Sequence, residues 1–199
     1  MSSIIAGGSA DVLEPVFLDR DGVINENVPA YVRSVDAWIP IPGSLEAAAS
    51  LSTAGHPVIV VTNQSGIGRG LVEASVVEEI NALMSERIRA LGGRLSGVYC
   101  CPHRPDEGCS CRKPATGLVD ASRRELGLPP GGWLVGDAVS DMELGRRTGL
   151  TTILVMTGRG AVQSRLCGPE SEPDFRAGDL AEAARLILGA RRTACGRTR

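Results

Sequence analysis

The stretch PVFLDRDG, residues 15–22, joins an apolar run directly to two aspartates and a glycine. An apolar run that stops abruptly at a polar turn predicts a short buried β-strand ending at Asp19. Two carboxylates held two positions apart repel each other, and they lose hydration when they are buried. Asp21-Gly22 would also fit an ordinary turn, so the meaning of the pair depends on the rest of the chain.

Four further apolar runs predict strands, and the amphipathic segments between them predict helices. The strands are expected at 15–19, 57–62, 95–101, 133–137 and 151–157, and the helices at 44–54, 73–91, 115–127, 139–148 and 179–189. This alternation is typical of a parallel sheet with right-handed crossovers. The expected fold class is therefore α/β, a three-layer α/β/α, Rossmann-like sheet whose ligands lie beyond the carboxyl ends of the strands.

The composition fits a single globular domain of ordinary size. The chain has 199 residues, of which 43% are hydrophobic and 22% charged, enough to enclose one core. We expect one domain at 15–190, a flexible segment at 1–14 and a flexible basic tail at 191–199. The net charge of -2 indicates neither a nucleic-acid nor a membrane partner. Residues 1–14 lack the features of a secretory signal, so a cytoplasmic location is expected. We also expect the protein to be a monomer.

Polar side chains follow three more of the predicted strands. A hydroxyl and amide cluster, TNQSG, occupies 62–66, Lys113 follows a cysteine-rich loop, and Asp137 ends a strand with Asp141 four residues later. Each of these has an ordinary alternative, such as a helix cap or a solvated lysine. Because parallel strands end at one edge of the sheet, the four segments together predict a common site there.

In chain order, D-x-D-G at 19–22, T-N-Q-S-G at 62–66, R-K-P at 112–114 and G-D-x-x-x-D at 136–141 resemble the haloacid dehalogenase superfamily of phosphatases. The resemblance covers roughly residues 15–160. It implies a phosphoric monoester hydrolase that works through an aspartyl-phosphate intermediate.

The resemblance also implies a role for each motif residue. Asp19 would be the nucleophile and Asp21 the general acid and base. Thr62 and Lys113 would stabilise the phosphoryl oxygens. Catalytic Mg²⁺ would be held by the carboxylates of Asp19 and Asp137 and by the main-chain carbonyl of Asp21.

The loop CPHRPDEGCSC, residues 101–111, has the spacing of a closed tetrahedral zinc site. The ligands predicted for a structural Zn²⁺ are Cys101, His103, Cys109 and Cys111. A proline- and glycine-broken loop of unliganded thiols is the alternative. Cys100 comes one position earlier in its strand, so we expect it to face the other way and pack in the core. Zinc would fix the next two residues, Arg112 and Lys113, beside Asp19.

The segment C-P-H…C-x-C-R-K-P narrows the resemblance to two groups, the heptose bisphosphate phosphatases and the histidinol-phosphate phosphatases. The segments at 17–27, 30–44 and 62–70 are similar to the first group. The implied reaction is loss of the C7 phosphate from D-glycero-D-manno-heptose 1,7-bisphosphate, with histidinol phosphate or another small phosphorylated sugar as the alternative substrate. The residues implied to contact the substrate are Asn27, Tyr31, Thr62, Asn63, Gln64, Ser65, Arg112 and Lys113.

No large cap domain is expected. Neither the segment between Gly22 and the helix at 44–54 nor the one between Gly66 and the third strand holds a separate folded unit. We expect the site to be covered only by a flap at 25–40 and by the zinc loop.

Overall fold

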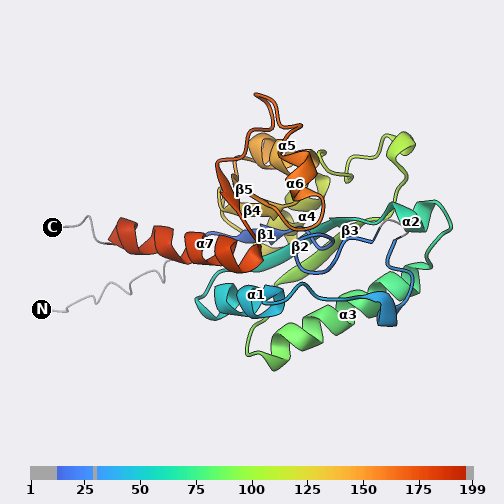
Figure 1. Cartoon of the computed structure of the whole chain (residues 1–199), viewed down its shortest axis with the longest axis horizontal. Helices are drawn as coiled ribbons and strands as arrows, with labels where there is room; N and C mark the ends of the chain where they lie inside the picture. The colour runs from blue at the N-terminus through green and yellow to red at the C-terminus, as the bar shows by residue number, and fades with distance from the viewer. Residues whose placement is uncertain (1–12, 29–30, 196–199) are drawn as a thin grey trace, which may run out of the picture.

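The apolar run that precedes Asp19 forms β1, Val16–Leu18, in the interior of a six-stranded sheet. The structure, a computed structural model, describes residues 13–28 and 31–195, with the backbone alone for 191–195. All strands run parallel in the order β3-β2-β1-β4-β5-β6 (Figure 1). The other strands are β2 (Val58–Asn63), β3 (Gly97–Cys101), β4 (Trp133–Gly136), β5 (Thr151–Val155) and β6 (Phe175–Ala177).

Helices cover both faces of this sheet and give the three layers that the sequence predicts. The longer helices are α1 (Ser44–Thr53), α3 (Ala74–Ala90), α4 (Gly117–Leu126), α5 (Val139–Thr148) and α7 (Leu180–Cys195). The short elements are α2 (Ser65–Gly68), α6 (Gly160–Gln163) and the 3-10 turns η1 (Val35–Ala37) and η2 (Pro105–Glu107). The predicted fold class is confirmed.

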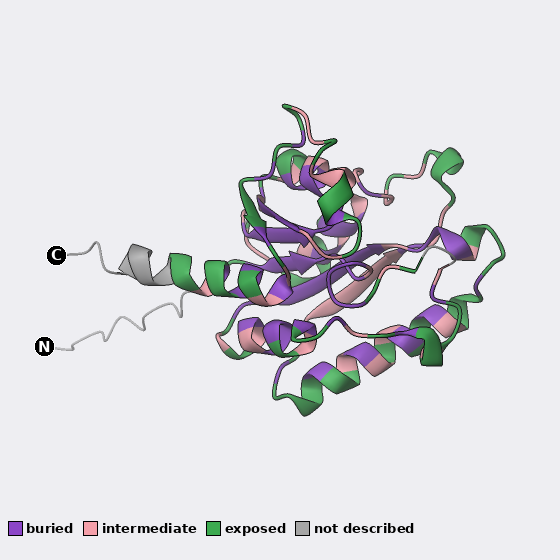
Figure 2. Ribbon diagram, viewed as in Figure 1, coloured by how far each residue is buried: buried purple, intermediate pink, exposed green. Residues whose placement is uncertain are grey.

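Burial in the sheet explains why its strands are apolar on both faces. Val16 and Leu18 belong to the core shared with α1, α3 and α7, whereas Phe17 between them belongs to the core shared with α4 and α5. All three side chains are fully buried because successive residues of a strand point to opposite faces. The central strands accordingly lie entirely within the buried part of the molecule (Figure 2).

Two details differ from the sequence prediction. The strand β6 was not predicted, since it has only three residues and two of them, Phe175 and Arg176, are exposed. The last helix continues to Cys195 instead of ending near residue 189. Most of the two segments predicted to be flexible, 1–14 and 191–199, lies outside the described residues.

The prediction that Cys100 packs in the core is wrong. Its side chain is only partly buried and belongs to neither core cluster, although the next residue, Cys101, is fully buried. The reason is the position of β3 at the edge of the sheet, where four of its five residues are only partly buried.

The strand order places the predicted site motifs at one point of the sheet. The chain proceeds outward from β1 through β2 to β3, then returns to the other side of β1 with β4 and proceeds outward again. A crevice forms where the strand order reverses, beyond the carboxyl ends of β1 and β4. Asp19 and Asp137 directly follow these two strands, so the fold brings them together across 118 residues of sequence.

The described part of the chain contains no cap domain. Between β1 and α1 the only regular element is the 3-10 turn η1, and between β2 and β3 there are only α2 and α3. Among the described residues, none of the helices combines the length and apolar character needed to cross a membrane.

Candidate active site

Three buried carboxylates meet at the carboxyl ends of β1 and β4. Asp19 is 5% exposed, and Asp137 and Asp141 are both 0% exposed. One oxygen atom from each side chain lies within 4.8 Å of the others. Asp141 reaches this position from the first turn of α5, where its Oδ2 accepts a hydrogen bond from the main-chain N–H of Ala138 at 3.1 Å. Such an acidic cluster would be strongly repulsive without nearby cations.

Lys113 supplies positive charge from inside the protein. Its Nζ lies 2.8 Å from Asp19 Oδ1 and 2.7 Å from Asp141 Oδ1, and it donates a 3.0 Å hydrogen bond to the carbonyl of Val61. Asn63 fixes the lysine's backbone, because its side-chain amide exchanges two hydrogen bonds with the main chain of Lys113, at 3.2 and 3.0 Å. The end of β2 thus positions a lysine that lies 50 residues further along the chain.

The ionisation of these groups reflects an excess of negative charge. Burial raises the pKa of Asp19 to about 7, the charge of Lys113 opposes the shift, and Asp141 and Asp137 add to it. Burial lowers the pKa of Lys113, but Asp141 and Asp19 outweigh that effect, so its pKa is raised and the lysine stays charged. Lys113, together with Arg159, whose Nη2 lies 3.1 Å from Asp137 Oδ1, gives two positive charges beside three acids. A further cation beside them would favour the ionised form of Asp19.

Asp21 belongs to the same loop, but a different set of side chains holds it. Its carboxylate accepts hydrogen bonds from Gln64 Nε2 at 2.6 Å, Asn25 Nδ2 at 2.8 Å and the guanidinium of Arg20 at 3.2 to 3.3 Å. Gln64 also donates to the hydroxyl of Thr62 at 2.9 Å. Asp21 is therefore held at the cavity wall, linked through Gln64 to Thr62, and its carboxylate is not part of the three-acid cluster.

A cavity of about 460 Å³ opens above these residues. Every residue that the sequence predicts to contact a substrate lines it, and Asp137 lies buried next to it. Three polar lining residues were not predicted from the sequence: Arg69, Ser140 and Arg159. Ser140 and Arg159 belong to no motif and so give no signal in a single sequence, whereas Arg69 lies within the segment 62–70.

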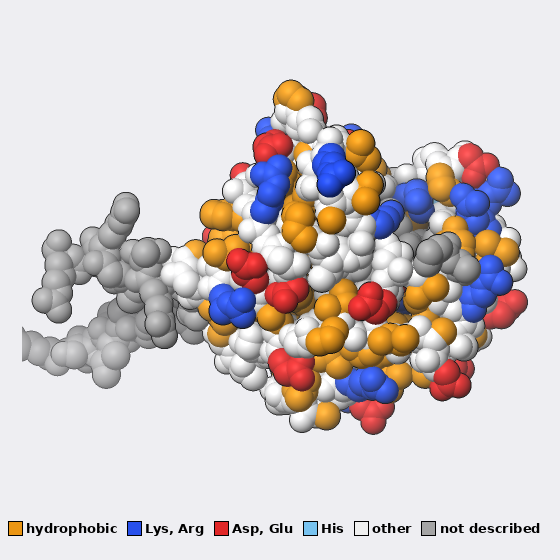
Figure 3. Space-filling view, viewed as in Figure 1, with side chains coloured by type: hydrophobic (Ala, Val, Ile, Leu, Met, Phe, Trp, Pro, Cys, Tyr) orange, Lys and Arg blue, Asp and Glu red, His pale blue; other side chains and the backbone are white. Residues whose placement is uncertain are grey.

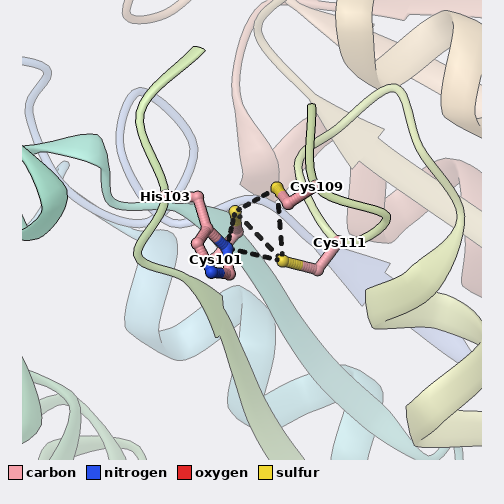
Figure 4. Close-up of side chains that lie close together, drawn as sticks. All are labelled: Cys101, His103, Cys109 and Cys111. Atoms are coloured by element: carbon pink, nitrogen blue, oxygen red, sulfur yellow. Dashed lines mark hydrogen bonds between the residues drawn. The ribbon is translucent and has the colours of Figure 1, made fainter. Parts of the chain in front are cut away.

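A second cluster lies on the loop between β3 and α4. The side chains of Cys101, His103, Cys109 and Cys111 point toward one another (Figure 4). The three sulfur atoms are 3.3 to 3.6 Å apart, and His103 Nδ1 lies 3.2 Å from the sulfur of Cys111. Zinc-sulfur bonds of about 2.3 Å in a tetrahedron separate the sulfur atoms by about 3.8 Å, so the four groups have nearly the geometry of a closed zinc site.

This loop is joined to the active site by its backbone. The main-chain N–H of Gln64 donates to the carbonyl of Cys101 at 2.8 Å, and that of Gly68 donates to the carbonyl of Pro102 at 2.9 Å. A Cβ atom at Gly68 would lie 2.7 Å from the same carbonyl oxygen, so only glycine allows α2 to approach so closely. The loop therefore borders the cavity and leads directly into Arg112 and Lys113.

Residues 110–183 match the family model of HAD-like hydrolases. The D-glycero-beta-D-manno-heptose-1,7-bisphosphate 7-phosphatase of Pseudomonas aeruginosa is 42% identical over 174 residues, which cover 87% of this chain and 97% of the relative. The chain belongs to the haloacid dehalogenase-like hydrolases.

Other members of the family support the same assignment. The enzyme of the same name from Neisseria meningitidis (serogroup A) is 42% identical over 146 residues, covering 73% of this chain and 78% of that protein. The crystal structure of the D,D-heptose 1,7-bisphosphate phosphatase from B. bronchiseptica, complexed with magnesium and phosphate, has a TM-score of 0.83 and 37% identity, covering 89% of this chain and 99% of that one. The prediction of a haloacid dehalogenase superfamily phosphatase is confirmed.

The glycine of the D-x-D-G motif yields a prediction about this hydrolase. Gly22 has φ +88°, and a Cβ atom there would lie 2.2 Å from Asp137 Oδ2. We expect Gly22→Ala to lower the free energy of unfolding by about 1–3 kcal/mol more than a glycine replacement without this collision. We also expect it to abolish phosphatase activity, because Asp137 must move.

The matched control is Gly70→Ala. Gly70 also has a positive φ, +66°, but its missing Cβ would meet nothing within 4 Å. Urea unfolding of both variants separates the backbone strain that they share from the collision with Asp137. Equal destabilisation of the two variants, or full activity in Gly22→Ala, would contradict the prediction.

Proposed function

We propose that this hydrolase removes the C7 phosphate of D-glycero-D-manno-heptose 1,7-bisphosphate through an aspartyl-phosphate intermediate. The names of its relatives support the substrate. The observation that carries the reaction is the contact of Lys113 Nζ with Asp19 Oδ1 at 2.8 Å, deep in a cavity open to a small molecule. This contact places a buried cation directly beside the proposed nucleophile.

In the proposed first step, a carboxylate oxygen of Asp19 attacks phosphorus and the bond from phosphorus to the C7 oxygen breaks. Asp21 gives its proton to the departing oxygen. Water then attacks the aspartyl-phosphate, Asp21 takes the proton, and inorganic phosphate leaves with the Asp19 carboxylate restored. The hydroxyl of Thr62 and the ammonium of Lys113 stabilise the phosphoryl oxygens. Gln64 joins Asp21 to Thr62, so the proton carrier and the phosphate site are held together.

Magnesium fits the charge of this site. Three buried carboxylates lie together here, and Lys113 contacts two of them. They offer the anionic oxygen ligands that a hard divalent ion prefers. Asp19, Asp137 and the main-chain carbonyl of Asp21 would hold the ion. When bound, it would reduce the repulsion between the carboxylate of Asp19 and the phosphate. Asp141 is engaged by Lys113 and Ala138, so we assign it to holding the lysine.

We also propose that the Cys101, His103, Cys109 and Cys111 cluster holds a structural zinc ion. The near-tetrahedral separation of the ligand atoms supports this, and none of the five cysteines whose side chains the structure describes forms a disulfide. Four protein ligands leave no coordination position for a substrate. The role of the zinc is to stabilise the loop that carries Arg112 and Lys113.

The nucleophile assignment predicts that Asp19→Asn abolishes phosphate release without lowering stability. The pKa of Asp19 is about 7 in the folded protein, above its usual value near 4 in an unfolded chain. Above pH 7 the folded state must therefore keep an unfavourable buried charge, and asparagine removes it. We expect the melting temperature at pH 8, without magnesium, to be equal to or higher than that of the wild type.

Asp120→Asn is the control. Asp120 is exposed on α4, so this substitution removes the same charge at a position away from the site. It should keep full activity. Measurable turnover by Asp19→Asn would rule out Asp19 as the nucleophile.

The zinc assignment predicts about one zinc ion per chain in freshly purified protein and its loss in Cys109→Ser. Activity should fall with the metal, because Arg112 and Lys113 lose their fixed position. Cys167→Ser, outside the cluster, should keep both zinc and activity. Elemental analysis checks the metal content, and wild-type protein without zinc would contradict the assignment.

The substrate proposal predicts a role for Arg112, which lines the cavity next to Lys113. Arginine and lysine side chains gather at the end of the molecule that carries α2 (Figure 3). A second phosphate on the substrate would be bound by such a cation through charge-assisted hydrogen bonds. Arg112→Ala should lower kcat/KM for the bisphosphate roughly thirtyfold, about 2 kcal/mol, and should affect a simple monophosphate ester much less.

The test is phosphate release from both anomers of the heptose 1,7-bisphosphate, histidinol phosphate and simple sugar phosphates, with magnesium and with EDTA. Arg104→Ala is the control, since Arg104 lies on the same loop but is exposed and paired with Asp106. Equal losses on mono- and bisphosphates would remove Arg112 from recognition. A preference for histidinol phosphate would replace the proposed substrate.

A further inference from the structure

Arg159 contacts the proposed magnesium ligand Asp137 from the solvent side. It precedes α6, and its side chain lines the cavity. Its Nη2 lies 3.1 Å from Asp137 Oδ1, and its Nε lies 3.4 Å from Asp137 Oδ2. The arginine side chain is 55% exposed, whereas that of Asp137 is completely buried. No other ion-pair partner of Arg159 occurs among the described residues.

Asp137 has little freedom to offer its oxygens elsewhere. Oδ2 accepts a 2.8 Å hydrogen bond from the main-chain N–H of Arg159. Gly22 and Gly158 also pack against it so closely that a Cβ atom on either would lie within 2.4 Å of Oδ2. Oδ1 is therefore the oxygen available to a cation, and the guanidinium of Arg159 is already in contact with it.

We propose that the Arg159 guanidinium competes with magnesium for Asp137, and that the displaced side chain turns into the cavity to bind an anionic oxygen of the substrate. The inference rests on the proposed magnesium site. A divalent ion repels a guanidinium held against the same carboxylate. The exposed half of the arginine side chain allows it to move, and its backbone hydrogen bond to Oδ2 can remain. Magnesium binding and anion binding are then linked through one residue.

A purely structural role for Arg159 predicts the opposite effect on the metal. If the guanidinium only held Asp137 in place, its removal would loosen a ligand and weaken magnesium binding. If it competes with magnesium, its removal strengthens binding. The direction of the change in magnesium affinity therefore distinguishes the two roles.

The experiment is calorimetric titration of magnesium chloride into full-length protein in the absence of substrate, after dialysis against magnesium-free buffer without a chelator that would remove zinc. We expect Arg159→Gln to lower the magnesium Kd by about three- to fivefold, the upper part of the range for an ion pair with one exposed partner. Arg69→Gln removes the same charge from the cavity wall without an ion pair to Asp137, and its Kd should stay within about twofold of the wild type. Thermal melts without magnesium establish that both variants are folded.

Titration of inorganic phosphate into the magnesium-saturated proteins tests whether the displaced Arg159 side chain binds an anion. Arg159→Gln should bind phosphate about fivefold more weakly than the wild type, because the displaced guanidinium is missing. Unchanged or weaker magnesium binding by Arg159→Gln, an equal gain in Arg69→Gln, or unchanged phosphate affinity would overturn the inference. Wild-type protein that binds no magnesium would instead overturn the metal site of the proposed function. Neither titration depends on which sugar is hydrolysed.

Discussion

The structure depends on holding three acids together at the point where the strand order reverses. Asp19, Asp137 and Asp141 would separate if the sheet, the first turn of α5 and Lys113 did not hold them. Burial raises the pKa of Asp19, and the charges of Asp141 and Asp137 add to that shift, so holding the three acids together lowers stability. The large apolar sheet around them offsets this cost, since strands β1 and β4 are completely buried on both faces. The negative charge that remains at this site would attract a further cation.

The same constraint explains why the loop between β3 and α4 is so elaborate. Lys113 must enter the acid cluster from a connection that otherwise runs over the surface, and a flexible loop would lose much conformational entropy in placing it. The four clustered cysteine and histidine side chains lie close enough to share the proposed zinc ion, which would shorten the effective length of that loop. Asn63 then fixes the backbone of the lysine from the neighbouring strand. The proposed zinc and Asn63 would therefore both serve to hold Lys113 beside the acids at the centre of the site.

The sequence predicted the elements whose signal is local. Five of the six strands and all the longer helices follow from apolar runs and amphipathic spacing, and the motif residues fall at strand ends because parallel strands share an edge. The strand β6 was not predicted because three residues, two of them exposed, give no hydrophobic periodicity. Cys100 was misplaced because alternation shows which face a side chain points to, but not whether another element covers that face. The contact of Arg159 with Asp137 joins two loops, and no local pattern encodes such a pairing.

The cavity has a base that holds the acid cluster and a mouth whose side chains would contact the rest of the substrate, and different parts of the fold supply the two regions. At the base, Asp19 and Asp137 directly follow strands, Asn63 at the end of β2 fixes the backbone of Lys113, and Asp141 comes from the first turn of α5. At the mouth, Asn27, Tyr31, Arg69 and Arg112 come from the flap, from α2 and from the cysteine-rich loop. Side chains on such connections can change without disturbing the sheet. Arg159 lies between the two regions, since it contacts the buried Asp137 and also lines the cavity. This position would allow one side chain to link magnesium binding at the base to anion binding at the mouth.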